Sequence, residues 1–252
     1  MQGETDADRT VLRITGADRS KFLGDLVTNS LNGLSSGLVY AALLSPQGKY
    51  LADFFLVPES DAILLDVDGS LAPSLVRRLA MYRLRADVRI EDTGLHVLRG
   101  LGPVPQGAFA DPRHPDLGWR AYSDQPGDSE RTNWDALRVD LMVPAAGAEL
   151  LPDDSYILEM GFERLHGVDF RKGCYVGQEV TARMKHKTEL RKGLARVRLD
   201  GPATPGTEIL SDGKPAGVLH TIAGDRALAY LRFDRAEGQM TAGDARVTLD
   251  GA

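Results

Sequence analysis

Two strand-forming runs joined by a short turn constrain most strongly how this chain can fold. Residues 38–44 and 50–57 are apolar and rich in strand formers, and Ser45-Pro46-Gln47-Gly48 connects them. Proline presets φ for the second position of a turn and glycine suits the fourth, so the two runs should form an antiparallel hairpin. A parallel pair would need a connection of about a dozen residues or more. The sequence therefore predicts antiparallel sheets rather than a doubly wound parallel sheet.

Helices alternate with further strands in the N-terminal part of the chain. Asp18 is placed to N-cap a helix whose apolar side chains recur at helical spacing. Ser70 opens a second helix, and Leu75, Leu79 and Tyr82 lie on one face of it. Further strands are expected over residues 10–14, 62–67 and 87–91. This alternation predicts α+β layers.

The character of the sequence changes twice after residue 100. Residues 100–131 are rich in Gly, Pro, Asp and Gln, which predicts loop-rich connecting structure. A helix is expected over 132–141, and residues 155–165 again have helical spacing. After Gly193, short β-type runs separated by Gly, Pro and Asp, with the hairpin signal Asp212-Gly213, predict a small β-barrel.

The expected fold class is α+β, with antiparallel sheets and helices in two N-terminal portions and a C-terminal β-barrel. The predicted boundaries give an α+β portion over residues 1–100, a second α+β portion over 101–192 and the barrel over 193–252.

Composition excludes several classes of protein. The net charge of −6 argues against a surface that binds nucleic acid or anionic lipid throughout. Cys174 is the only cysteine, so the chain has no intrachain disulfide and no four-cysteine metal site of its own. The first ten residues lack a basic and apolar leader, and no long apolar run occurs. We therefore expect a cytoplasmic protein without a membrane segment and without stable nucleic-acid binding.

The segment from Lys172 to Glu179 is the most informative in the chain. It reads Lys-Gly-Cys-Tyr-Val-Gly-Gln-Glu, and its glycines, Gly173 and Gly177, bracket the Cys174-Tyr175 pair. Glycine at these points allows a positive φ or close approach of the backbone to a ligand, although plain loop punctuation explains it equally well. Cationic neighbours and a helix start after Gly177 would favour a thiolate at Cys174, whereas a lone cysteine is more often a small buried apolar group.

Positive charge is concentrated after this segment. Residues 183–196 contain six cationic residues and one acidic residue, Glu189. In an acidic chain this favours an anionic ligand or an acidic partner, and a solvated charged face is the alternative.

Other candidate residues give weaker signals. Asp53 lies within an apolar strand, where alternation favours an outward-facing residue of a half-exposed strand over a buried charge with partners. The histidines show no metal-binding spacing, and no G-x-G-x-x-G or P-loop motif occurs. Cys174 with His166 or His186 would make a nucleophile and base only if the fold brought them together.

The signature from Lys172 to Glu179, followed by Ala182-Arg183, resembles that of the YgfZ family of folate-binding proteins. Residues 16–29, 45–53 and 167–170 are similar to family positions in the same order. This family is related to the glycine-cleavage T-protein, and its members are described as tRNA-modifying or iron–sulfur cluster assembly factors. The resemblance implies three domains around an opening of folate size, with residues 1–100 as the folate-binding portion.

The resemblance also implies a function in assembling or repairing iron–sulfur proteins, mainly those with [4Fe–4S] clusters. Tetrahydrofolate or a derivative would be the cofactor, and assembly carriers and client iron–sulfur enzymes the partners. Cys174 would be the reactive residue, either as one transient cluster ligand or as a nucleophile. The site around Cys174 and the folate would be shaped by Lys172, Tyr175, Gln178 and Arg183, with Asp53 as a candidate anchor and Tyr82 as a candidate wall.

Two departures from the family pattern bear on the activity. Residues 184–192 lack the Arg-Gly pair common in relatives. Asp53 follows Ala52 where T-protein relatives usually carry adjacent aspartates. A folate-dependent aminomethyl transferase of the T-protein type is therefore the second interpretation, a cysteine hydrolase is the third, and whether the chain is an enzyme stays open.

Overall fold

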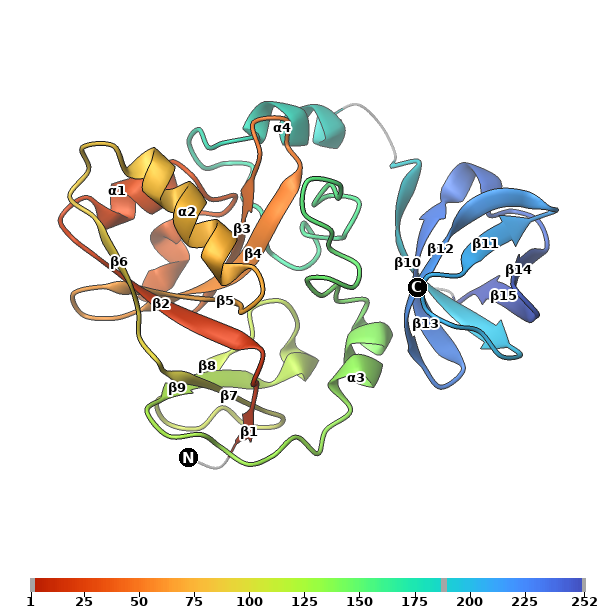
Figure 1. The fold of residues 1–252 in the computed structure, drawn as a ribbon, viewed down its shortest axis with the longest axis horizontal. Coiled ribbons are helices and arrows are strands. Elements are labelled where there is room, and N and C mark those ends of the chain that lie inside the picture. The colour runs from red at the N-terminus through yellow and green to blue at the C-terminus, as the bar shows by residue number, and fades with distance from the viewer. Residues whose placement is uncertain (1–2, 187–189, 251–252) are drawn as a thin grey trace. The chain divides into compact units, whose positions relative to one another are not determined.

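The computed structural model describes residues 3–186 and 190–250. The chain divides into two compact units, and we describe each by itself (Figure 1). The first unit contains residues 1–131 and 163–180, and the second contains residues 132–162 and 181–252.

An antiparallel sheet organises the first unit. Its strand order is β3 (Val39–Leu44), β4 (Tyr50–Pro58), β5 (Ile63–Asp68), β2 (Arg9–Thr15) and β6 (Arg89–Asp92). The predicted hairpin is confirmed: β3 pairs with β4, and Ala42 lies opposite Asp53. The turn closes as expected, because Gly48 donates its N–H to the carbonyl of Ser45 and has a φ of 76°.

Two helices cover one face of this sheet (Figure 1). They are α1 (Arg19–Gly24) and α2 (Ala72–Arg83). Leu75 and Leu79 of α2 are buried against the even-numbered apolar side chains of β4, such as Phe54. Asp18 stands at the N-cap of α1, but its side chain does not cap the helix; it accepts the N–H of Asp87 instead.

A second antiparallel sheet corrects the expectation of a loop-rich segment. Its order is β1 (Glu4–Thr5), β7 (His96–Gly100), β9 (Trp119–Ser123) and β8 (Phe109–Ala110). The prolines lie in the connections around β8 and β9, so they do not interrupt the longer strand β9. Short 3-10 helices occur at η1 (Leu31–Ser35) and η2 (Pro115–Leu117).

The second unit begins with α3 (Trp134–Leu141), where a helix was expected. The helix expected over residues 155–165 is wrong, because this stretch consists of turns. Gly161 within it has a φ of 79°, which an α-helix cannot accommodate. The helix α4 (Gln178–His186) follows the cysteine segment, and the division between the two units falls within it.

The C-terminal β-barrel is confirmed. It closes in the order β10 (Lys192–Asp200), β13 (Arg226–Arg232), β12 (Lys214–Ala223), β11 (Glu208–Ser211), β14 (Met240–Ala242) and β15 (Ala245–Leu249). The 3-10 helix η3 (Phe233–Arg235) follows β13. Asp212 and Gly213 both have a positive φ, as a tight hairpin turn requires. The α+β class with antiparallel sheets and a terminal barrel is therefore correct, and no helix among the described residues is both long and apolar enough to cross a bilayer.

Candidate functional site

The cysteine segment is anchored by the side chain of Lys172. Its Nζ donates hydrogen bonds to the backbone carbonyls of Gly24, at 2.7 Å, and of Val27. Gly24 is the last residue of α1 and Val27 lies three residues after it, so both acceptors are well over a hundred residues earlier in the chain. The same ammonium lies 4.9 Å from the ring centroid of Tyr175, which is 8% exposed. Partial burial lowers the pKa of Lys172 to about 8, against the raising effect of Asp169 and Asp25.

The two glycines of the segment differ in what they do. Gly177 has a φ of 83°, and a Cβ there would lie 2.6 Å from the carbonyl oxygen of Ser45. Gly48, in the turn between β3 and β4, faces Val180, whose Cβ would lie 2.7 Å from an added Cβ. The segment therefore packs backbone to backbone against the hairpin turn. A Cβ added at Gly173 would meet no atom within 4 Å, and this glycine has no positive φ, so it serves neither purpose against the protein itself.

The residues just before the segment are joined to the sheet by further hydrogen bonds. The hydroxyl of Thr28 donates to the carbonyl of Gly167 at 2.7 Å and accepts the N–H of Ala42. Asn29 donates to the carbonyls of Tyr40 and His166. These bonds hold the chain entering the cysteine segment to the edge of the sheet.

Cys174 itself is a free and exposed thiol. Gln178, at the start of α4, is partly exposed, and Arg183, on the same helix, is exposed. Within the described residues, no hydrogen bond joins Cys174 to His166 or His186, so the structure gives no support to a cysteine–histidine pair. No three His, Cys, Asp or Glu side chains gather as a metal site in residues 3–186 and 190–250. The thiol can therefore act as a nucleophile or as a single metal ligand.

Asp53 is buried, which corrects the outward-facing position that alternation favoured. Its side chain is on the sheet face opposite the helices, and the residue is 6% exposed. The hydroxyls of Tyr40 and Tyr50 donate to its two oxygens at 2.9 and 2.6 Å. Burial, together with the charge of Asp53, raises the pKa of both tyrosines. The strand is covered on both faces, so alternation carries no exposure signal here.

A buried ionic cluster lies on the same sheet face and was not foreseen. Asp66 is fully buried and accepts hydrogen bonds from Arg9, Arg120 and Tyr122. Asp111 pairs with Arg113, whose guanidinium lies over the ring of Phe55 (centroid distance 4.7 Å). Burial would raise the pKa of Asp111, but the charge and hydrogen bonds of Arg113, together with the charge of Arg120, outweigh it, so the pKa is lowered. An aspartate inside the apolar run Ile63–Asp68 was the sequence signal for this cluster.

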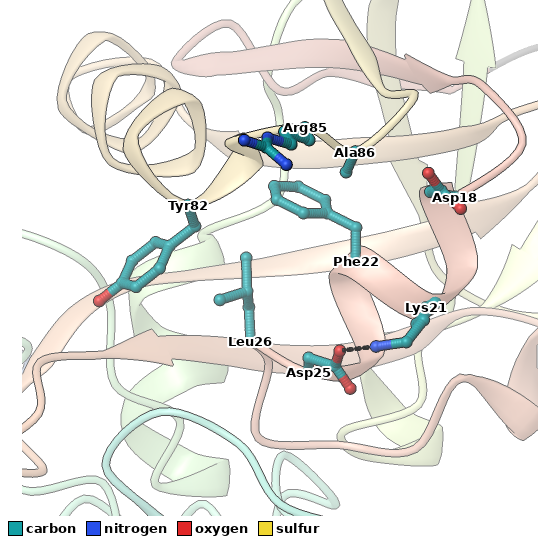
Figure 2. Close-up of a pocket in the computed structure, with 8 residues that line it drawn as sticks. All are labelled: Asp18, Lys21, Phe22, Asp25, Leu26, Tyr82, Arg85 and Ala86. Carbon is teal, nitrogen blue, oxygen red and sulfur yellow. Dashed lines mark hydrogen bonds and ion pairs between the residues drawn. The ribbon is translucent and has the colours of Figure 1, made fainter.

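Tyr82 belongs to a different surface from Asp53. It is 36% exposed near the end of α2 and lines a pocket with Phe22 and Leu26 on the helical face of the sheet (Figure 2). The structure therefore does not bring Asp53 and Tyr82 together, because they lie on opposite faces of the sheet.

The cationic stretch over residues 183–196 is not one continuous free patch. Residues 187–189, which include the cationic Lys187 and the acidic Glu189, lie outside the described residues. Arg196 belongs to β10 and pairs with Asp250 at 2.9 Å, so its charge serves the second unit.

Nearly the whole chain is similar to known proteins. Residues 191–251 match the model of the CAF17 C-terminal beta-barrel domain. The mitochondrial iron-sulfur cluster assembly factor IBA57 of Mus musculus is 31% identical, over 92% of this chain and 78% of that protein. Its Homo sapiens counterpart is 32% identical over the same shares. The aminomethyltransferase T of the glycine cleavage system from Bartonella henselae has the same fold, with a TM-score of 0.70 and 12% identity, covering 96% of this chain and 82% of that chain.

These relatives contradict the expectation of a cytoplasmic location. The matched proteins of Mus musculus, Homo sapiens and Mycosarcoma maydis are all named as mitochondrial. The absence of a recognisable leader in the first ten residues was therefore a poor basis for a location.

Proposed function

The chain belongs to the IBA57 family of iron–sulfur cluster assembly factors, and we propose that it acts as an accessory protein in the assembly or repair of [4Fe–4S] proteins. The observation that carries this proposal is an exposed thiol on a firmly anchored segment. In this proposal the cluster, or its precursor, is the cargo.

The chemistry of a lone thiol sets what the protein contributes. A cluster takes several thiolate ligands, and this chain has one cysteine. Cys174 would supply one transient ligand, and a carrier or client protein would supply the others. Anchoring by Lys172 and Gly177 keeps the thiol at a defined place on the surface, so a partner loses less conformational entropy when the shared cluster forms.

Tetrahydrofolate, or a derivative, is the cofactor that we propose for this site. The residues around the thiol fit it in part: Gln178 offers an amide, whereas Tyr175 is buried and its ring already faces the ammonium of Lys172. Arg183 is the residue we propose for the glutamyl tail, whose carboxylates a guanidinium binds well. Asp53 fits less well as an anchor, because both of its oxygens already accept tyrosine hydroxyls. That engagement also gives the aminomethyl transferase alternative no support.

Complementation tests the assembly function. We expect deletion of the gene to lower the activity of [4Fe–4S] enzymes in cells, and wild-type protein to restore it. Cys174→Ala should fail to restore it, whereas Gly173→Ala should succeed, because the neighbouring position is open and the thiol is kept. Full restoration by Cys174→Ala, at equal protein level, would refute the role of the thiol.

Calorimetry with tetrahydrofolate tests the cofactor separately. Binding to the wild-type chain and weaker binding to Gln178→Ala would support it. A wild-type chain that releases no heat with tetrahydrofolate would remove the folate part and leave the assembly part in place.

A further inference from the structure

The end of α2 exposes apolar side chains that the fold does not use. Met81 is 75% exposed and Leu84 is 88% exposed, with Tyr82 between them at 36%. Single exposed apolar residues are ordinary on protein surfaces, whereas a contiguous group marks an interaction site. We call Met81, Tyr82 and Leu84 the α2 ridge.

A pocket adjoins the α2 ridge. Its volume is about 420 Å³, and Tyr82, Leu26 and Phe22 form its apolar part (Figure 2). Its charged lining residues are Asp18, Lys21, Asp25 and Arg85. Lys21 and Asp25 pair with each other at 2.6 Å, and Asp18 accepts the backbone N–H of Asp87. The pocket is large enough for one or two apolar side chains of a partner, and the ridge beside it would cover them.

The charge around the ridge is entirely positive within α2 and the turn after it. Between Ser70 and Ala86 the chain has four arginines and no acidic residue, although its net charge is −6. Arg77 precedes Met81 by one helical turn, and Arg83 and Arg85 flank Leu84 in the sequence. This arrangement complements a partner surface that combines carboxylates with an apolar anchor.

The backbone presents the ridge at a conformational cost. Leu84 has φ 44° and ψ −103°, and Ala86 donates its N–H to the carbonyl of Arg83, which closes a tight turn around it. This is the first central position of a type II′ turn, where glycine is the usual residue. Gly118 adopts nearly the same angles, φ 68° and ψ −118°, in this chain. A leucine kept in this conformation while facing solvent points to a function outside the folded chain.

We propose that the α2 ridge and its pocket bind an acidic segment of a protein partner, with an apolar side chain of that segment inserted beside Phe22 and Leu26. An anionic membrane is a weaker fit, because the chain is acidic overall and the pocket is concave. This inference does not depend on the iron–sulfur function, since the ridge contains no residue of the Cys174 segment.

Selection from a random peptide library displayed on phage tests the proposal on the purified full chain. The same selection is run in parallel on the variant Leu84→Gly, which removes the exposed leucine of the α2 ridge and has the residue that this turn favours. Peptides enriched on the wild-type chain and not on this variant should be acidic and contain apolar residues. A synthetic copy of an enriched peptide should bind roughly tenfold or more weakly to Leu84→Gly, as when a central anchor is lost, and equally to Leu249→Ser on the barrel.

Charge reversal completes the test. Arg85→Glu should weaken binding of the same peptide and remove most of the salt dependence of that binding. Arg131→Glu, at an exposed arginine elsewhere, should change neither. Neutral or basic peptides among the enriched set would overturn the proposal, as would equal enrichment on the wild-type chain and on Leu84→Gly. Sedimentation with phosphatidylserine vesicles that depends on Leu84, or dimerisation that depends on it in light scattering, would replace the acidic segment by a membrane or by a second copy.

Discussion

Replacing Leu84 by glycine should make the protein more stable, although it deletes a large apolar side chain. Leu84 holds φ 44° and ψ −103°, a conformation that costs a non-glycine residue roughly 1–3 kcal/mol. The side chain is 88% exposed, so removing it loses only about 0.3 kcal/mol of burial. Glycine adds an entropic cost of roughly 0.5–1 kcal/mol in the unfolded chain. The balance is a gain of about 1 kcal/mol.

The measurement is the midpoint of urea unfolding followed by far-UV circular dichroism, with thermal melting beside it. A gain of this size corresponds to a rise in Tm of about 2–4 °C for a chain of this length. Leu84→Ala is the matched control: it removes the same side chain beyond Cβ and keeps the strain, so its stability should stay near that of the wild type. Met81→Gly, inside α2 and also largely exposed to solvent, should lower stability by about 1 kcal/mol.

The ordering of these variants decides the matter. If Leu84→Gly is no more stable than Leu84→Ala, the turn is not strained, and the backbone conformation of Leu84 no longer supports a binding function for the α2 ridge. If Leu84→Gly is more stable and also no longer binds the acidic peptide, then leucine at this position lowers folding stability and raises the affinity for the partner. Such a stability–function trade-off is expected at a functional surface.

Three further predictions concern the cysteine segment and the buried cluster. In an NMR titration Lys172 should show a midpoint near pH 8, whereas Lys21, whose pKa is raised by its hydrogen bond to Asp25, should titrate above 10.5. Between pH 8 and the ordinary lysine pKa of 10.5, the unfolded chain binds more protons at residue 172 than the folded chain does, so stability should rise with pH through that window, and Lys172→Met should flatten the rise. Asp66→Asn should lower the free energy of unfolding by about 3–5 kcal/mol, because two buried guanidinium groups lose their shared carboxylate. Gly177→Ala should cost about 1–3 kcal/mol and Gly173→Ala less than about 0.5, and equal losses in urea melts would contradict the close packing.

The parts of the fold that local signals determine were predictable. The proline and glycine positions in Ser45–Gly48 are enough to predict the turn, and the apolar face of α2 predicts which side of the helix packs on the sheet. The barrel could be foreseen because its strands are separated by residues that favour turns. In these cases a short stretch of sequence is enough to determine the local structure.

The parts that depend on distant partners were not predictable. The strand β9 lies among prolines, and its identity comes from pairing with β7, about twenty residues earlier. Residues 155–165 have helical spacing, but Gly161 takes a positive φ and the chain turns there. Spacing reports which side chains are apolar, and it does not report where the backbone reverses.

The candidate site divides in the same way. Cys174 could be singled out because it is the only cysteine and stands between glycines, but its exposure is a property of the folded chain. Asp53 could be noticed as a charge in an apolar strand, whereas its tyrosine partners could not, since a single sequence does not say which residues meet across a sheet. An aspartate in such a strand indicates that its carboxylate has buried hydrogen-bonding partners, but it does not indicate what function that interaction has.

The anchoring of the cysteine segment explains why Lys172 matters although it does not carry the reactive atom. Its ammonium occupies two carbonyls at the end of α1, where unpaired acceptors would otherwise face a partly buried space. An arginine there would keep the charge but not the compact geometry, because its planar fork cannot place one nitrogen on both carbonyls in the same way. We therefore expect Lys172→Arg to leave the fold intact and to displace the segment, which iodoacetamide labelling of Cys174 would report as a changed rate. An unchanged rate, in a chain that is folded by circular dichroism, would show that the thiol is positioned by Gly177 and the hairpin turn alone.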